Sequence, residues 1–258
     1  MSWIITPSNL LVDDQDAMTY LAAVEAADGQ ALESGVRLAV NAFIKGCKAD
    51  GIWPAIKASC ILAGARTLNG ALVPLVGTAP TKFGTEAGWN YNRETGLKGN
   101  GTDNYLNSNR ANNADPQNSK HVAVNVSQIN TATNQPIFGT NTSFNAGSTV
   151  WHAGVGGSVN VGVNSTAQNT GSGLFVGTNA LSRSSSTAFT AKLVSSVQTY
   201  SIASVTPVFN NINFLTGYAG ADYSNARITF YSIGEALDLA LLDARVTTLM
   251  NALAAAIP

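Results

Sequence analysis

The middle of the chain, residues 84–232, consists of short segments that alternate apolar and polar residues, separated by Gly, Asn and Ser. HVAVNVSQI alternates valines from Val122 to Val126, and SVNVGV repeats the pattern from Val159 to Val163. A period of two is typical of a β-strand with one buried face. No helical segment interrupts this region to serve as a crossover, so we expect antiparallel pairing. Short strands with frequent turn residues indicate a sandwich or barrel.

Helical patterns precede this region. A first helix is predicted over AMTYLAAVEAA, capped by Asp14 or Asp16, and a second over ALESGVRLAVNAFIKGCKADG, ended by Gly51. A third is predicted over PAIKASCILAG, because a proline such as Pro54 suits the first position of a helix. Each helix has a narrow apolar stripe, so we expect the three to pack on the β-rich part.

The end of the chain changes from a strand pattern to a helix pattern. Ile228 to Tyr231 are β-branched or aromatic, whereas the residues from Glu235 favour a helix. The pattern predicts one apolar helical face, made of Leu237, Leu241, Ala244, Thr248 and Leu249. This helix is expected to cover the sandwich or the N-terminal helices, and an oligomer contact is the alternative.

Charge is distributed unevenly along the chain. Residues 1–83 carry 13 charged side chains, and residues 84–232, which are nearly twice as many, carry 12. We therefore predict three parts: an N-terminal helical region (1–83), a β-sandwich (84–232) and a C-terminal helix (233–258).

Only 11% of the residues are charged and the net charge is −1, against roughly 25% charged residues in typical soluble domains. A nucleic-acid partner is not expected, because it would require clustered Lys and Arg. The N-terminus does not resemble a signal peptide, and no apolar run approaches the ~18 residues of a membrane span. We expect a soluble protein without membrane insertion, made in a reducing compartment. Cys47 and Cys60 are expected to be buried free thiols.

No catalytic motif is present, so no catalytic residue, resident metal or cofactor is predicted, and we expect no enzyme. His121 is interpreted as a strand-edge residue facing water. One alternative is a glycosidase, for which Glu86 and Glu94 would supply the carboxylate pair. The other acids of the β region are interpreted as turn formers: Asp103, Asp115 and Asp222.

Aromatic residues in loop contexts are the candidate binding residues. GWNYN places Trp89 and Tyr91 on one side of an extended segment, and TVWHAG places Trp151 beside His152. Flat amphipathic rings suit both sugar faces and protein interfaces. Core packing is the competing interpretation for these four residues.

Three segments resemble known proteins. GLKGNGTDNYLNSN resembles an early strand of concanavalin A-like, or LamG-like, jelly rolls, and ARITFYSIGEALDLALLDARV resembles their final strand and following helix. The stretch from AAVEAADGQ to LVGTAP is similar to a segment of tailed-bacteriophage structural proteins, where it precedes such a jelly roll. The resemblance covers roughly residues 14–110 and 222–250.

The resemblance implies a concanavalin A-like jelly-roll sandwich with N-terminal helices and a C-terminal helix, located in a virion. The expected role is a tail fibre or adhesin component that attaches to the host surface. The expected partners are other virion proteins and a host-surface glycan, and a homo-oligomer is expected, with a trimer first. A capsid cement (decoration) or baseplate protein with a purely architectural role is the alternative. Some LamG-like domains hold calcium, and only Asp103 offers a comparable position here.

Overall fold

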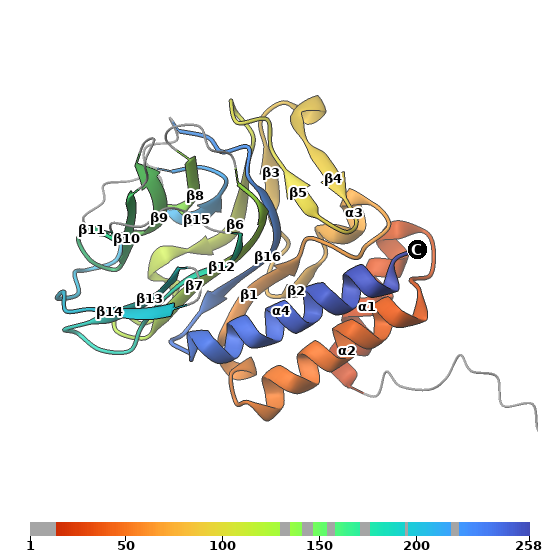
Figure 1. Cartoon of the computed structure of the whole chain (residues 1–258), viewed down its shortest axis with the longest axis horizontal. Coiled ribbons are helices and arrows are strands. Elements are labelled where there is room, and N and C mark those ends of the chain that lie inside the picture. Colours follow the sequence, from red (N-terminus) through yellow and green to blue (C-terminus); the bar gives the residue numbers. More distant parts are fainter. Residues whose placement is uncertain are drawn as a thin grey trace, which may run out of the picture.

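Two antiparallel β-sheets are stacked face to face, and helices cover the outer side of one of them (Figure 1). The computed structural model describes residues 14–129, 135–140, 147–153, 158–170, 176–193, 196–217 and 222–258. Its helices are α1 (Gln15–Asp28), α2 (Ser34–Ala49), α3 (Leu68–Ala71) and α4 (Leu239–Ala256), with the 3-10 turns η2 (Trp53–Ala55), η3 (Glu86–Gly88) and η4 (Asn112–Ala114).

The first sheet, sheet A, has nine strands, with the order β14-β13-β12-β7-β16-β1-β2; β5 also pairs with β16, and β4 pairs with β5. Its strands are β1 (Ile56–Ile61), β2 (Pro74–Val76), β4 (Asn90–Asn92), β5 (Gly96–Lys98), β7 (Lys120–Gln128), β12 (Gly177–Arg183), β13 (Phe189–Leu193), β14 (Ser196–Tyr200) and β16 (Arg227–Gly234).

The second sheet, sheet B, has seven strands in the order β11-β10-β9-β8-β15-β6-β3. Its strands are β3 (Thr81–Phe83), β6 (Tyr105–Ala111), β8 (Gln135–Gly139), β9 (Ser148–Ala153), β10 (Ser158–Val163), β11 (Gln168–Asn169) and β15 (Asn211–Phe214). The predicted class of a mainly β, antiparallel sandwich with N-terminal helices and a C-terminal helix is confirmed.

Two hydrophobic cores lie on opposite sides of sheet A. Val122, Val124 and Val126 of β7 point into the core between the two sheets, while Ala123 of the same strand points into the core beneath the helices. The predicted alternation of β7 is therefore present, but both of its faces are buried. In a half-exposed strand, polar residues occupy every second position. In a strand covered by a helix, small residues can occupy the same positions, so the sequence pattern alone does not distinguish the two cases.

The third predicted helix is wrong. After η2, residues Ile56–Ile61 form β1, which lies between β16 and β2 in sheet A. Cys60 points into the core between the sheets and Ile61 into the core under the helices. Pairing with β16, in which Ile61 lies opposite Phe230, decides this segment against its local helix preference.

The predicted boundary at residue 83 is also not a structural boundary. Strands β1 and β2 belong to sheet A and β3 belongs to sheet B, although all three precede residue 84. The charge count misplaced the boundary because the first strand still carries charge: Lys57 lies within β1 and Arg66 follows it in the next connection. The sandwich begins at Ile56, and the helical region before it is α1 and α2.

Helix α4 packs through a different face from the one predicted. Its buried residues are Leu239, Leu242, Val246, Leu249 and Leu253. Of the predicted face, only Leu249 is buried in the helix, and Leu241 is 38% exposed. The helix begins after Asp238, whose side chain accepts hydrogen bonds from the Ala240 and Leu241 N–H groups. Because α4 is rich in Ala and Leu all round, its sequence does not single out one stripe.

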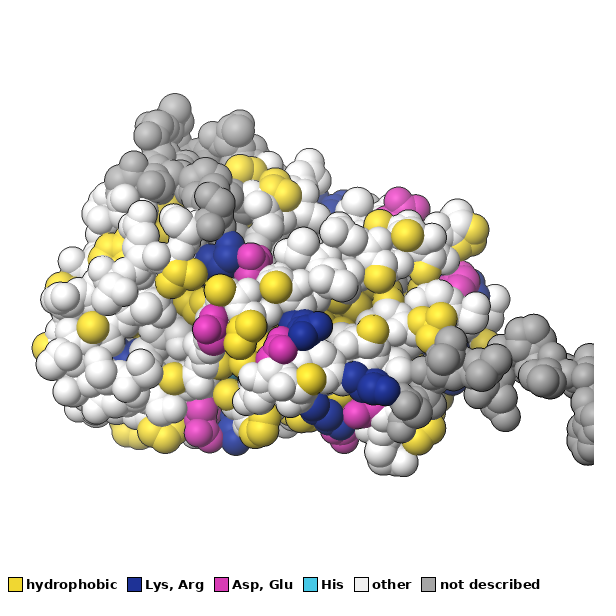
Figure 2. All heavy atoms as spheres, turned by 60° about the horizontal axis from the view of Figure 1, so that its bottom comes forward, with side chains coloured by type: hydrophobic (Ala, Val, Ile, Leu, Met, Phe, Trp, Pro, Cys, Tyr) yellow, Lys and Arg dark blue, Asp and Glu magenta, His cyan; other side chains and the backbone are white. Residues whose placement is uncertain are grey.

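By length and composition alone, α4 would also meet the criteria for a membrane-spanning helix. In this fold its buried stripe packs against α2 and sheet A. Figure 2 shows the surface around the helices, where the few charged side chains lie in small groups of both signs among uncharged atoms. Arg245 of α4 illustrates this, because its guanidinium forms two hydrogen bonds of 2.6 and 2.8 Å with Asp50.

Both cysteines are free and buried, as predicted. Cys47 lies in α2, and burial raises the pKa of its thiol to about 12. Burial also raises the pKa of Cys60 well above its usual range. The two thiols are therefore protonated and unreactive at neutral pH.

The interpretation of His121 as a water-facing residue is wrong, because its side chain is fully buried. Its Nδ1 lies 2.6 Å from the Glu235 carbonyl oxygen and its Nε2 lies 2.7 Å from Ser232 Oγ. A carbonyl only accepts, so Nδ1 carries the proton and Nε2 accepts from the Ser232 hydroxyl. The imidazole thus links β7 to the end of β16, and burial lowers its pKa to about 4.

This burial predicts a pH-dependent stability. The folded pKa is depressed, so the unfolded state binds a proton that the folded state does not, and stability is lost as the pH falls from about 6.5 to about 4. The contribution of His121 is about 3 kcal/mol over this interval. Urea denaturation at several pH values should show a steeper loss for the wild type than for His121→Gln. Equal slopes for the two proteins would contradict the prediction.

Candidate functional site

The outer face of sheet B is the candidate site. Helices α1, α2 and α4 cover the outer face of sheet A (Figure 1), whereas no described helix covers sheet B. On β6 and β15, Leu106, Ile212 and Phe214 point into the core between the sheets. The alternate positions on these strands therefore point outward.

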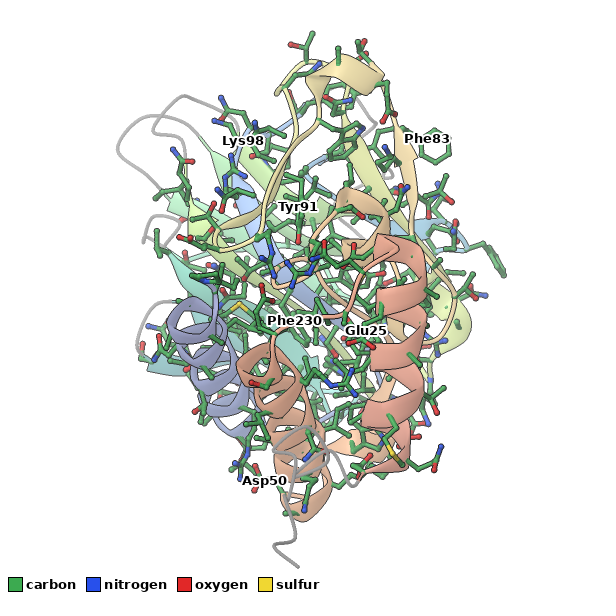
Figure 3. All side chains as sticks on the ribbon, turned by 90° about the vertical axis from the view of Figure 1, so that its right-hand side faces the viewer. Glu25, Asp50, Phe83, Tyr91, Lys98 and Phe230 are labelled. Carbon is green, nitrogen blue, oxygen red and sulfur yellow. The ribbon has the colours of Figure 1, made fainter. Side chains whose placement is uncertain are left out.

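Three aromatic rings form a row on this outer face. Phe83 of β3 lies opposite Tyr105 of β6, and the two rings are parallel, with centroids 4.8 Å apart and an interplanar angle of 5°. Tyr223 continues the row, 6.3 Å from Tyr105. Phe83 is 41% exposed, and Figure 3 shows it pointing away from the body of the protein. One face of an aromatic ring is thereby open at the edge of the sheet.

A turn of asparagine and aspartate residues holds this edge in place. The Asp103 carboxylate accepts hydrogen bonds from Thr85 N (2.9 Å), from Thr85 Oγ1 (2.7 Å) and from Asn100 Nδ2 (2.6 Å). Asn104 Nδ2 donates to the carbonyls of Phe83 and Thr85. Gly84 sits at φ +95°, where a Cβ would lie 2.4 Å from the Asp103 carbonyl oxygen. Only glycine fits at this position, so Gly84 fixes the point at which β3 ends.

Amide side chains lie next to the aromatic row. Across β3, β6, β15 and β8, the residues at one level are Thr81, Asn107, Asn213 and Gly139. Asn107 Oδ1 accepts from Asn211 Nδ2 (3.1 Å) and from the Asn109 N–H (2.8 Å). These bonds fix the orientation of the Asn107 amide.

Two amide atoms at this level have no protein partner among the described residues. Asn213 is 4% exposed, and its Oδ1 is buried without a hydrogen bond. Asn107 Nδ2 has no hydrogen-bond partner in the described part of the chain, and its residue is half-buried. Within the described residues, one amide donor and one buried amide acceptor beside the aromatic row are thus without a partner. A buried unsatisfied acceptor is costly, and it calls for a partner such as a hydroxyl or water.

The side chains of this face suit a neutral ligand that forms hydrogen bonds. The outward residues of β3, β6 and β15 at this end carry no charge, and Lys82 is engaged by Glu86 at 2.6 Å. Burial raises the pKa of Tyr105, so its phenol stays protonated at neutral pH. Flat rings that adjoin amide donors and acceptors suit a ring with one apolar face and peripheral hydroxyls.

Two of the candidate residues from the sequence, Trp89 and Tyr91, lie elsewhere. Both pack against the core between the sheets, and Figure 3 shows Tyr91 in the interior. The Tyr91 hydroxyl donates to the Ala65 carbonyl at 2.7 Å, and burial raises the pKa of this phenol well above its usual range. Trp89 Nε1 is buried without a partner among the described residues. Their contacts support the core-packing interpretation that the sequence left open.

The other two candidates, Trp151 and His152, are in β9 of sheet B. In the ladder with β10, Trp151 pairs with Asn160 and His152 pairs with Val159. Their side chains lie outside the described part of the structure, so their role stays a prediction.

Of the acidic residues considered from the sequence, Glu86 and Asp103 are engaged by neighbouring side chains, whereas Glu94 contributes its backbone N–H to a turn. Glu86 pairs with Lys82, and the Glu94 N–H donates to Asn92 Oδ1 within the turn between β4 and β5. Hydrogen bonds from Thr85 and then Asn100 lower the pKa of Asp103. Both Asp103 carboxylate oxygens are therefore engaged by the turn described above. Among the described residues, no group of three or more His, Cys, Asp or Glu could hold a metal ion.

Sequence reasoning missed Phe83, Tyr105 and Asn107. A signal was present, since TKFG and DNYLNSN each place an aromatic beside a turn residue, and LNSN alternates Leu106 with Asn107. What the sequence did not contain was the pairing of β3 with β6, which brings two rings 22 residues apart into contact.

No protein-family model matches this chain, and no curated protein matches it. Among solved structures, an α-L-arabinofuranosidase variant of glycoside hydrolase family 54, soaked with 4-nitrophenyl α-L-arabinofuranoside, is similar at 11% identity and a TM-score of 0.37, over 60% of this chain and 40% of that one. A botulinum neurotoxin type C structure, whose cell entry depends on two ganglioside molecules, is similar at 10% identity and a TM-score of 0.45, over 78% and 51%. Domain 4 of an extracellular arabinanase from Geobacillus stearothermophilus, in complex with arabinotriose, is similar at 10% identity and a TM-score of 0.40, over 74% and 97%.

The chain thus spans about half or less of the length of the first two of these proteins. At such identities and TM-scores the similarities carry no conclusion about ligand or activity. The fold assignment rests on the strand order and on the two cores of this structure.

Proposed function

We propose that this chain is a structural protein of a tailed-bacteriophage virion, and that its sandwich attaches to a neutral glycan on the host surface without cleaving it. The observation that carries the attachment role is the open Phe83–Tyr105 pair beside the Asn107 and Asn213 amide atoms that lack a partner among the described residues. The virion location rests on the resemblance of the stretch from AAVEAADGQ to LVGTAP to a segment of phage structural proteins.

Each part of the face has a role in this proposal. The exposed Phe83 ring stacks on the apolar face of a sugar ring, and Tyr105 supports Phe83 from behind. Asn107 Nδ2 donates to a sugar hydroxyl, and a hydroxyl or bridging water donates to Asn213 Oδ1. Since no charged group takes part, affinity should change little between about 50 mM and about 500 mM salt.

Phe83→Ala is expected to lower the affinity for the host glycan about tenfold, because it removes the stacking ring without disturbing the core. Phe209→Ala is the matched control, since Phe209 is 79% exposed and precedes β15 at the end that pairs with Ala111, away from Phe83. Binding of the full-length protein to host cells or to purified surface polysaccharide is the measurement. Equal losses for the two variants, or none, would contradict the proposed face.

The architectural alternative predicts a different result. A cement protein would show no glycan binding, and gold-labelled antibodies would decorate the capsid of intact particles evenly. The attachment role predicts a few labelled positions on the tail. Release of soluble sugars by the wild type, lost in Glu86→Gln or Glu94→Gln, would instead indicate a depolymerase and overturn the non-catalytic part of the proposal.

A further inference from the structure

An apolar groove lies at the free edge of sheet A, on the side of this sheet that faces the helices. It has a volume of about 350 Å³ and runs between α1, η2 and β2. The residues used in the argument are Tyr20, Ala23, Trp53, Val73, Leu75 and Val76.

One wall of the groove is an unpaired strand edge. β2 pairs with β1 on one side only and is the last strand of sheet A among the described residues. Backbone N–H and C=O groups on such an edge need partners, and an uncovered edge can pair with other chains. The groove therefore offers backbone hydrogen-bonding groups beside apolar side chains, which is the combination that recognises an extended peptide.

The polypeptide enters α1 beside this groove. Asp14 caps α1, and its carboxylate is held by Lys48 Nζ at 2.7 Å. The same ammonium group lies 5.7 Å from the centre of the Trp53 ring, which lines the groove. Asp16, in the first turn of the helix, lines the groove as well. Residues 1–13, which lie outside the described part, are therefore attached to its rim.

The composition of residues 1–13 matches the groove. None of residues 2–12 is charged, and residues 3–12 include six large apolar residues: Trp3, Ile4, Ile5, Leu10, Leu11 and Val12. Ten extended residues reach about 33 Å, far enough to follow an edge strand and return to Asp14. Pro7 is compatible with this path, because a proline is tolerated in an edge strand.

We propose that residues 3–12 of the same chain fill this groove and add a strand to the free edge of β2. The apolar side chains cover Trp53, Val73 and Val76, and the backbone pairs with the free groups of β2, in which Pro74 supplies only a C=O. The segment of the same chain is favoured over that of a second copy because its attachment point, Asp14, is already fixed at the rim by Lys48.

Hydrogen exchange of the full-length protein, read by mass spectrometry, tests the proposal. Residues 3–12 should exchange at least about tenfold more slowly than in a free peptide of the same sequence. Ala23→Arg, which places a long charged side chain in the groove, should restore the free rate. Ala22→Arg is the matched control, since Ala22 is also exposed on α1 but does not line the groove. Free-peptide rates in the wild type, or protection that survives Ala23→Arg, would overturn the proposal.

Disulfide trapping distinguishes the same chain from a second copy. Single cysteines at Ile4, Ile5 or Leu10 are each combined with Ala23→Cys; the native Cys47 and Cys60 are buried and do not compete. A cross-link within the monomer for at least one pair is the expected result. A cross-linked dimer would assign the groove to the segment of a neighbouring copy, and absence of any cross-link would reject the docked segment; either result overturns the proposal as stated.

Discussion

Replacing Asp115 by asparagine is expected to lower the free energy of unfolding by about 3–5 kcal/mol. Asp115 and Lys120 are both buried, with 4% and 0% exposure, and the Lys120 ammonium lies 3.3 Å from the Asp115 carboxylate and 2.8 Å from the Asn112 carbonyl oxygen. Arg110 binds the same carboxylate through two nitrogens. An amide at position 115 would leave the buried ammonium without a counter-charge. Urea denaturation at pH 7 measures the effect.

Two further variants distinguish the effect of the uncompensated Lys120 charge from that of a general loss of hydrogen bonds. Glu86→Gln makes the same chemical change in the exposed Glu86–Lys82 pair, and it should cost less than about 1 kcal/mol. The double variant Asp115→Leu with Lys120→Met removes both buried charges, and it should be less destabilised than Asp115→Asn alone. If the double variant were the less stable of the two, the uncompensated charge would not be the cause.

The pH dependence gives a second signature of the same ion pair. Burial lowers the pKa of Lys120 from 10.5 to about 8, against the opposing effect of Asp115. Without Asp115 the folded pKa should fall further, so the unfolded state binds the extra proton over a wider interval and stability rises with pH across it. The deficit of Asp115→Asn should therefore be smaller at pH 9 than at pH 6.

Replacing Arg183 by methionine is expected to cost about 3–5 kcal/mol, because four carbonyl groups would lose a buried donor. The Arg183 side chain is fully buried and donates to the carbonyl oxygens of Val163 (2.8 Å), Ser185 (3.0 Å), Ala188 (3.2 Å) and Ile202 (3.2 Å). No described carboxylate pairs with it. The Arg183 guanidinium thus connects β10, the turn after β12 and the segment after β14 through hydrogen bonds.

The geometry of these bonds predicts that lysine cannot replace Arg183. An ammonium group has three donors on one atom, whereas the guanidinium directs its donors along a rigid fork. Arg183→Lys should therefore recover only part of the lost stability. Hydrogen exchange should show the largest loss of protection between residues 184 and 188 in both variants. Full recovery by lysine would show that the charge, and not the fork, is what the carbonyls require.

The two buried cations explain how a sandwich with few charges holds its irregular connections. Arg110 extends from β6, the strand that also carries Tyr105 and Asn107 of the candidate face. Asp115 thereby anchors the far end of β6, while Asp103 anchors the turn before it. Charge in the sandwich thus serves to fix backbone, and the exposed face of the same strand is left neutral for the proposed glycan.

The sequence by itself determined the fold class. The valine alternation of β7 and β10, the Asp14 cap of α1, the glycine after α2 and the strand-to-helix change after β16 are local signals, and a single period or end residue predicts each of them. The burial of Cys47 and Cys60 was also predictable, because apolar neighbours surround both thiols. These features depend on residues that lie within a few positions of one another.

The tertiary structure alone decided the rest. β1 is a strand because β16 and β2 lie on either side of it, and the buried His121 ring is bound by Ser232 and the Glu235 carbonyl at the end of β16. The candidate face exists because β3 pairs with β6 and brings Phe83 against Tyr105. Pairing and coverage of this kind are made by residues far apart in the chain, whose free energies depend on contacts that no local pattern encodes.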